Sequence, residues 1–266
     1  MAADGGAQGA AQSGSAPARV VSLNLCTDQM AHLLAAPGQL VSVSWLAYDP
    51  RSSALADQIT APPNAGSAEE IMLLAPDLVV AGRFSARATV DMLTRLDVRV
   101  EIFDPPNSFD DVRAAWRRMG MLLGRGAAAE ALIADFDARL TDLRAQTGPA
   151  PRAALYYALG NTAGDATLPG EILRAAGLTN IATELGLPPF GARLPLETLV
   201  MVQPDLVLVG APYGGHAQAT ELLSHPALRH LGLRRIPGGD MSCETPALLD
   251  SVAGLIALRQ DWEAAQ

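Results

Sequence analysis

The side chains in this chain of 266 residues that are best suited to nucleophilic chemistry are its two cysteines, Cys26 and Cys243. Cys26 comes directly before a helical pattern, and a thiol at a helix N-terminus can have a lowered pKa. No plausible histidine partner lies nearby in sequence, and the chain has no GxSxG, Walker A, HExxH or strand-following GxGxxG motif. We therefore expect no catalytic residue and no enzyme activity, with a cysteine-dependent hydrolase as a remote alternative.

Whether the two cysteines are bonded to each other depends on their separation in space. Cys26 follows the first predicted strand and Cys243 precedes the last predicted helix, so both should border the same region. A disulfide needs Cα atoms within roughly 7 Å, and nothing in the sequence brings the two residues that close. We predict two free thiols.

The four histidines raise the question of a bare metal ion. A zinc or manganese site needs three or four ligands that converge in space. His32 lies within a helical pattern, while His225 and His230 share one polar segment and His216 stands alone. This spacing does not favour convergence, so we predict no metal site and no cofactor.

The composition favours a freely soluble acidic protein. The formal net charge is -9 and the pI about 4.9, whereas binding to nucleic acid needs clustered Lys and Arg. No apolar run approaches the roughly 18 residues of a membrane span. Residues 1–18 are small and polar, and we expect a disordered leader there, with the native signal peptide or lipid anchor absent from this sequence.

Short apolar strands alternate with helical patterns in the first half of the chain. The predicted strands are Arg19–Leu25, Leu40–Trp45, Asp77–Gly82 and Val98–Phe103, and the predicted helices between them include Thr27–Ala36 and Ala86–Leu96. Strands of nearly continuous Val and Leu that alternate with helices are typical of a mainly parallel sheet covered on both faces. The sequence therefore predicts an α/β fold.

A second α/β unit follows, and one long helix separates the two units. The second unit contains strands at Ala153–Leu159 and Asp205–Gly210, while Ala127–Gln146 shows one apolar stripe over about 20 residues. At the standard rise this helix is roughly 30 Å long. We predict an N-terminal lobe over 19–124, a linking helix within 125–151 and a C-terminal lobe over 152–266. Because a continuous helix resists bending, we expect little hinge motion.

An internal repeat supports two related lobes. Residues 69–82 read EEIMLLAPDLVVAG and residues 197–210 read ETLVMVQPDLVLVG, at an offset of 128 residues. Each copy begins with an acid, continues as an apolar helix, breaks at Pro76 or Pro204, and enters a buried strand through Asp-Leu-Val.

At this point the chain resembles a known family. The order SLNLCTDQMAHLLA, GSAEEIMLLAPDLVVAGR, a long helix, LETLVMVQPDLVLVG and a helix after CETP is similar to the periplasmic binding proteins of ABC importers for cobalamin and ferric siderophores. The resemblance covers residues 19–262. It implies a periplasmic monomer of two lobes joined by one rigid helix, which holds a metal chelate in the cleft and delivers it to a permease in the inner membrane.

Candidate ligand residues lie where predicted strands end, because ligands of open parallel sheets bind beyond the carboxyl ends of the strands. In these loops or strand ends stand Asn24, Trp45, Tyr48, Arg83, Phe84, Tyr157, Tyr213 and Met241. Arg83 could bind an anionic oxygen through two parallel hydrogen bonds. The aromatic residues could form walls for a flat ligand, although each could equally be packing.

The resemblance also assigns a role to two acids. Glu69 and Glu197 each stand seven residues before the proline of the repeat. In the family, one acid on each lobe at this position pairs with arginines of the permease, so these are the predicted docking residues. Glu70 instead completes an S-x-x-E capping box with Ser67.

For the ligand we expect a ferric siderophore first, cobalamin second and haem third. Arg83, with Arg87 and Arg193, would suit a negatively charged ferric chelate, whereas a corrinoid needs flat apolar surface and amide partners. Among the tryptophans, only Trp45 is placed to face a ligand, because Trp116 and Trp262 fall within helices.

Overall fold

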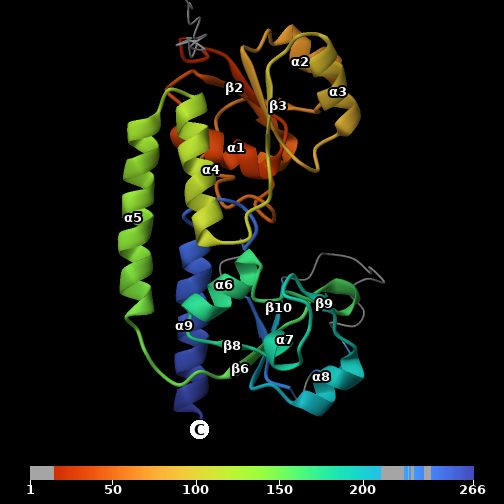
Figure 1. Ribbon diagram of the computed structural model, residues 1–266, viewed down its shortest axis with the longest axis vertical. Helices are drawn as coiled ribbons and strands as arrows, with labels where there is room; N and C mark the ends of the chain where they lie inside the picture. The colour runs from red at the N-terminus through yellow and green to blue at the C-terminus, as the bar shows by residue number, and fades with distance from the viewer. Residues whose placement is uncertain (1–14, 211–224, 227, 229–230, 237–240) are drawn as a thin grey trace, which may run out of the picture.

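The computed structural model describes residues 15–210, 225–226, 228, 231–236 and 241–266. They form two α/β lobes stacked along the long axis of the molecule, with long helices along one side (Figure 1). The predicted fold class is confirmed. Tyr213, His216 and His230 lie outside the described residues. None of the described helices is long and apolar enough to cross a membrane.

The N-terminal lobe is built on a parallel sheet of five strands in the order β3-β2-β1-β4-β5. The strands are β1 Val20–Ser22, β2 Leu40–Ser44, β3 Pro63–Asn64, β4 Leu78–Gly82 and β5 Val100–Phe103. The helices of this lobe are α1 Leu25–Leu34, η1 Trp45–Tyr48, α2 Ala68–Leu73 and α3 Arg87–Arg95. The central strands β1 and β4 are almost fully buried, as their continuous apolar sequence requires.

The C-terminal lobe repeats this plan on a smaller scale. Its parallel sheet has the order β11-β10-β6-β8, with β6 Arg152–Leu155, β8 Thr179–Asn180, β10 Leu206–Val209 and β11 Leu233–Arg235. A separate antiparallel pair joins β7 Asn161–Thr162 to β9 Ala192–Arg193. The remaining elements are η2 Ala158–Gly160, α6 Leu168–Ala175, α7 Ile181–Glu184 and α8 Leu196–Val202.

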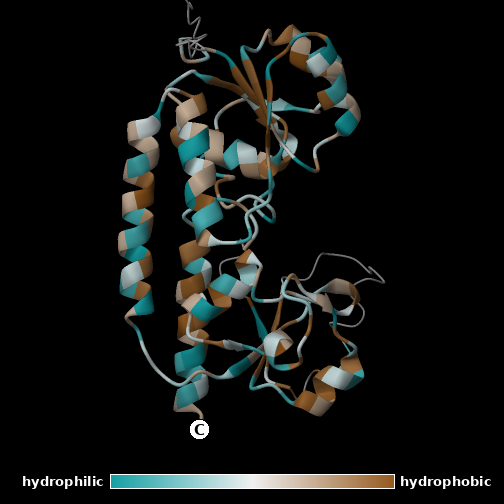
Figure 2. Cartoon of the chain, viewed as in Figure 1, coloured by the Kyte–Doolittle hydropathy of each residue, from teal (hydrophilic) through white to brown (hydrophobic). Residues whose placement is uncertain are grey.

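Three long helices hold the two lobes together: α4 Phe109–Leu122, α5 Gly126–Arg144 and α9 Leu248–Ala264. The predicted linking helix corresponds to α5, which is 19 residues long. The Phe136 ring of α5 packs edge-on against Trp116 and Phe109 of α4, with centroids 5.2 and 5.6 Å apart. One buried hydrophobic cluster continues from these helices into both sheets, and Figure 2 shows the mostly hydrophobic strands that it covers.

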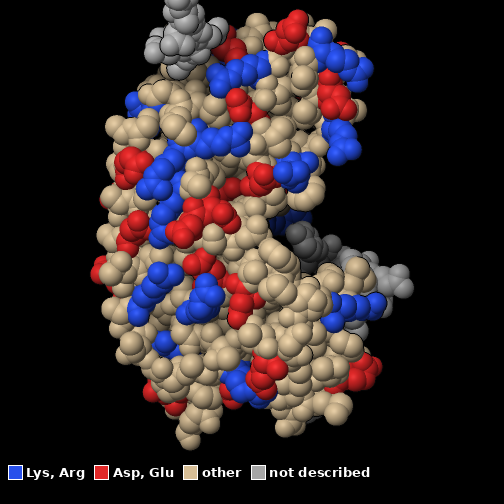
Figure 3. Space-filling view, viewed as in Figure 1, with Lys and Arg blue, Asp and Glu red and all other residues tan. Residues whose placement is uncertain are grey.

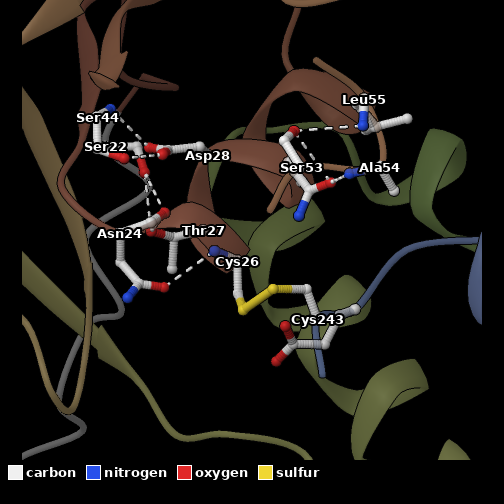
Figure 4. Close-up of a disulfide and its surroundings, with 12 residues drawn as sticks. Ser22, Asn24, Cys26, Thr27, Asp28, Ser44, Ser53, Ala54, Leu55 and Cys243 are labelled. Atoms are coloured by element: carbon white, nitrogen blue, oxygen red, sulfur yellow. Dashed lines mark hydrogen bonds between the residues drawn. A yellow bond between two sulfur atoms is a disulfide. The ribbon is translucent and has the colours of Figure 1, made fainter. Parts of the chain in front are cut away.

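The prediction of two free thiols is wrong. Cys26 at the start of α1 and Cys243 before α9 form a disulfide, with their Cα atoms 4.8 Å apart (Figure 4). The segment before α9 returns to the N-terminal lobe, where the Trp116 indole N–H donates to the Glu244 carbonyl at 2.8 Å. The lobes are thus tied at a second point besides α5. Because Cys26 carries no free thiol, the cysteine-dependent hydrolase loses its nucleophile.

Candidate ligand-binding cleft

The surface is hollowed between the two lobes on the side opposite α5 (Figure 3). On the N-terminal wall, a cavity of about 150 Å³ opens beyond the carboxyl ends of β2 and β3. Its lining consists of Leu23, Ser44, Trp45, Leu46, Asn64, Ala65, Gly66, Ala86 and Thr89. Trp45 is 60% exposed, so its indole is available to a ligand.

The side chains beneath this cavity are polar and buried. The backbone N–H and the hydroxyl of Ser44 both donate to the Asp28 carboxylate, which is fully buried in α1 (Figure 4). Burial raises the pKa of Asp28 to about 6, against the opposing effect of hydrogen bonds from Ser22 and Ser44. A carboxylate in such a place keeps the ends of β1 and β2 in register.

Asn64 ties β3 into the same network. Its amide nitrogen donates to the Ser22 carbonyl at 3.1 Å and to the Ser42 hydroxyl at 2.9 Å, while the Ser42 hydroxyl donates its own proton to the Pro62 carbonyl. Its buried Oδ1 has no hydrogen-bond partner. Apart from this Oδ1, the side-chain polar atoms of Asp28, Ser42, Ser44 and Asn64 below the cavity already have hydrogen-bond partners.

Two of the predicted ligand residues have structural partners. The Asn24 side chain accepts from the Cys26 N–H at 3.0 Å and caps α1. It also packs against Gly82, where a Cβ would come within 2.8 Å of the Asn24 Cγ. The Tyr48 hydroxyl donates to the Ala61 carbonyl at 2.8 Å, and its side chain is 40% exposed.

The hypothesis that Arg83 binds an anionic ligand requires an unpaired guanidinium, and Arg83 is paired. Its guanidinium pairs with the Asp104 carboxylate just beyond β5, and this hydrogen bond lowers the pKa of Asp104. Both side chains are exposed, so the pair stabilises the fold little. Its effect is to neutralise the positive charge that a ligand would meet. Phe84, the next residue, is 82% exposed.

The remaining predicted ligand residues divide between the core and the undescribed segment. Met241 is buried in the central hydrophobic cluster, against which Tyr157 packs while half-buried. Burial raises the pKa of Tyr157. Tyr213 lies outside the described residues. The described aromatic residues that are exposed are Trp45, Tyr48 and Phe84 of the N-terminal lobe and Phe190 of the C-terminal lobe.

The predicted docking acids lie at opposite ends of the molecule. Glu69 is exposed on α2 and Glu197 is exposed on α8, and both helices lie on the side away from α5 (Figure 1). Only half of the capping box expected for Glu70 is formed. The Glu70 N–H donates to the Ser67 hydroxyl, but the Glu70 carboxylate accepts from the Ala65 N–H instead of the Ser67 N–H.

A second cavity, of about 490 Å³, lies at the far end of α5 and includes three arginines in its lining. Arg259, which is buried, donates to the Gln146 carbonyl at 2.5 Å and to the Ala176 carbonyl at 3.2 Å. It thereby satisfies the C-terminal ends of α5 and α6. We interpret this cavity as part of the packing between helices rather than as a ligand site.

Sequence reasoning missed Asn64, Ser44 and Asp28. Asn64 lies in the PPNAG segment, which has the composition of a turn. One sequence pattern could have indicated these residues: the neighbouring strands β1, β2 and β3 each end in a polar residue, which is Ser22, Ser44 or Asn64. Among the described residues, no group of three or more His, Cys, Asp or Glu could hold a metal ion.

Comparisons with known proteins give a consistent result. Residues 20–232 match a family model described as "Periplasmic binding protein". The chain is 33% identical over 202 residues to a cobalamin-binding protein of Halobacterium salinarum. The aligned region covers 74% of this chain and 54% of the relative. The chain thus spans about half the length of the curated relatives it matches.

Solved structures share the fold at lower identity. The periplasmic heme-binding protein RhuT from Roseiflexus sp. RS-1 has a TM-score of 0.69 and 23% identity, with 92% of this chain and 99% of that chain covered. The periplasmic vitamin B12 binding protein BtuF of Vibrio cholerae has a TM-score of 0.65 and 20% identity, with 93% and 98% covered.

Proposed function

This chain belongs to the periplasmic binding protein family, and on that premise we propose that it captures a corrinoid between its lobes and delivers it to the permease of an ABC importer. The family consists of binding proteins for substrates such as cobalamin, haem and siderophore chelates. We assign the chain a binding role, with no catalytic step.

The observation that carries the choice of ligand is the Arg83–Asp104 ion pair. The sequence favoured a ferric siderophore because Arg83 would offer a free cation to an anionic chelate. Once the arginine is paired, that argument loses its main support. The exposed Trp45 and Phe84 offer flat apolar surface instead, which suits a corrin ring. The 33% identity to a cobalamin-binding protein points the same way.

A ferric siderophore is the second candidate. Arg87 is exposed in the first turn of α3, next to the loop that carries Phe84. It could still contact a negatively charged chelate.

The disulfide supports an extracytoplasmic location. Cys26 and Cys243 are bonded, and disulfides persist in oxidising compartments such as the bacterial periplasm. We propose that the protein works there as a monomer.

Ligand identity is tested by titrating the purified protein with cyanocobalamin, haemin and a ferric hydroxamate siderophore, with tryptophan fluorescence as the signal. We expect cyanocobalamin to bind with a Kd of about 1 μM or tighter and the other two to bind more weakly. The Trp45→Phe variant checks that the signal comes from the cleft. Tight binding of the siderophore with none of cyanocobalamin would refute the proposed ligand.

The role of Arg83 is tested in the same titration. Because Asp104 neutralises its charge, we expect Arg83→Ala to change the affinity for cyanocobalamin by less than about twofold. A loss of tenfold or more would show that Arg83 leaves Asp104 and contacts the ligand.

The partner proposal concerns Glu69 and Glu197. The double variant Glu69→Ala/Glu197→Ala should leave ligand affinity unchanged but weaken uptake by membrane vesicles that contain the permease, because exposed charges set orientation and association rate. A fall in ligand affinity would instead place the two acids in the pocket.

A further inference from the structure

The two short helices that carry the docking acids share a second feature, which the comparisons do not assign. Leu73 on α2 is 87% exposed and Met201 on α8 is 84% exposed. Few large apolar side chains in the described part of the chain are exposed to this degree, and Figure 2 shows the hydrophobic residues of both helices at the two ends of the molecule.

Leu73 and Met201 occupy equivalent positions of the internal repeat. They are 128 residues apart, the same offset that relates Glu69 to Glu197. Each follows its acid by four residues, so acid and apolar side chain lie on the same face of the helix. Each lobe therefore presents a pair made of one exposed carboxylate and one exposed aliphatic side chain, Glu69 with Leu73 and Glu197 with Met201. We call these two pairs the docking patches.

The backbone around the patches is also equivalent. Ala75 and Gln203 have φ values of 43° and 46°, and they too are 128 residues apart. Both helices therefore end with the same left-handed turn before the proline. The patches lie at opposite ends of the molecule on the side away from α5 (Figure 1), as a two-fold rotation of one lobe onto the other would place them.

We propose that Leu73 and Met201 are apolar anchors that insert into two equivalent sockets of a two-fold symmetric partner, each socket being apolar beside a basic side chain. A surface repeated twice is matched by a partner that repeats its own surface twice. The acids set orientation, and the aliphatic side chains supply the area removed from water. This inference rests on the proposed function, because the partner of this symmetry is the permease dimer.

The test uses right-side-out membrane vesicles from cells that contain the permease but lack this protein. Purified protein, loaded with whichever radiolabelled chelate binds in the titration above, is added at increasing concentration, and uptake gives the half-saturating protein concentration. We expect Leu73→Ser and Met201→Ser each to raise that concentration by about tenfold, and by similar factors. Maximal uptake, ligand affinity and melting temperature should not change.

The control is Met121→Ser, because Met121 is 72% exposed on α4, away from both patches. It should leave the half-saturating concentration unchanged. Salt separates the two components: at about 1 M NaCl, where the Debye length is roughly 3 Å, the effect of Glu69→Ala/Glu197→Ala should shrink while that of the apolar variants persists.

The proposal is overturned if Leu73→Ser and Met201→Ser have no effect on half-saturation, or if Met121→Ser has the same effect. It is also overturned if the wild-type protein sediments as a dimer that these variants dissociate, since the anchors would then join two copies of this chain. Failure of cyanocobalamin alone to bind changes only the ligand, because docking is measured with the chelate that does bind. Absence of uptake with wild-type protein would count against both proposals.

Discussion

The two lobes use the same residues to start their sheets. In the N-terminal lobe, the Asp77 carboxylate accepts from the backbone N–H groups of Ala18 and Arg19, both at 2.8 Å. In the C-terminal lobe, Asp205 accepts from the Arg152 N–H at 2.7 Å. The arginine then binds the end of the repeat helix, Arg19 at the Leu74 carbonyl and Arg152 at Val202 and Gln203. The Asp of each PDLV unit thus fixes the first strand of its lobe.

The lobes differ where their strands end. In the N-terminal lobe β1, β2 and β3 end in Ser22, Ser44 and Asn64 over the buried Asp28. In the C-terminal lobe β6, which corresponds to β1, ends in the apolar Leu155, and β10, which corresponds to β4, ends in Val209. Among the described strands of this sheet, only β8, which lies beside β6, ends in a buried polar residue, Asn180. The shared unit is thus the part that builds the lobe and carries the docking patches. We infer that ligand selection depends on the strand ends, which differ.

The largest expected effect comes from the disulfide, the covalent tie between the two lobes besides α5. Cys26 and Cys243 are 217 residues apart. Closing a loop of that length lowers the entropy of the unfolded chain, which corresponds to about 5 kcal/mol of stability. The measured stabilisation by a disulfide is often smaller than this value. Cys26→Ser/Cys243→Ser should therefore lower the free energy of unfolding by about 3–5 kcal/mol.

Urea titration checks this, and it also tests whether the lobes are independent. Trp45 and Trp116 report on the N-terminal lobe and α4, while Trp262 reports on α9. In the variant we expect the two signals to separate, because one of the ties between lobes is gone. Wild-type protein with reductant should reproduce the variant, and an unchanged midpoint would contradict the prediction.

The second effect belongs to the N-terminal lobe alone. Burial raises the pKa of Asp28 from 3.8 to about 6, so the folded state binds a proton more tightly than the unfolded chain does. The stability that this proton contributes is present below about pH 4 and is lost as pH rises through about 6. The full difference is about 3 kcal/mol.

Asp28→Asn removes this dependence. Between pH 7 and pH 4, the free energy of unfolding of the wild type should rise by about 2–2.5 kcal/mol relative to the variant, as measured by urea titration at each pH. The control Asp142→Asn changes an exposed carboxylate of α5 and should shift the curve little. Parallel curves for wild type and Asp28→Asn would show that folding does not raise the pKa of Asp28.

The sequence predicted the two lobes because the repeat and the apolar strands are local patterns. The linking helix was predicted as Ala127–Gln146 and is observed as Gly126–Arg144. The prediction differs only at the two ends, because the capping residues determine where a helix starts and stops. The disulfide was not predictable, because it depends on how the segment before α9 returns to α1.

The partner of Arg83 was missed for a related reason. Asp104 is 21 residues further along the chain and follows the neighbouring strand β5. Strand order therefore brings the two together. The unpartnered Oδ1 of Asn64 likewise follows from the pairing of β2 with β3. Contacts of this kind depend on sheet topology, which a single sequence leaves open.

The third prediction concerns the residue that the two lobes share. Asp77→Ala removes the acceptor of two backbone N–H groups, and Asp205→Ala removes that of one. Asp77 is exposed and Asp205 is half-buried, so water can replace the first acceptor more easily. We expect each to cost about 1–2 kcal/mol, with Asp205→Ala at the upper end. Thermal unfolding of both variants gives the comparison, and a loss confined to one lobe would mean that the two units are not equivalent.

The smallest expected effect tests the equivalence at the backbone. Ala75 and Gln203 hold φ values of 43° and 46°, a left-handed conformation that costs a residue with a Cβ roughly 1 kcal/mol or more. Glycine adopts it without that strain, but loses more backbone entropy on folding, by roughly 0.5–1 kcal/mol. Ala75→Gly and Gln203→Gly should therefore each stabilise the protein by a few tenths of a kcal/mol to about 1 kcal/mol. Ala145→Gly, at a position with φ of -69°, is the matched control and should destabilise it, because only the entropy term applies there. Differential scanning calorimetry measures the effect of each substitution. Stabilisation at one of the two repeat positions and destabilisation at the other would mean that only one lobe has the left-handed turn. The symmetric placement of the docking patches would then lose its backbone support.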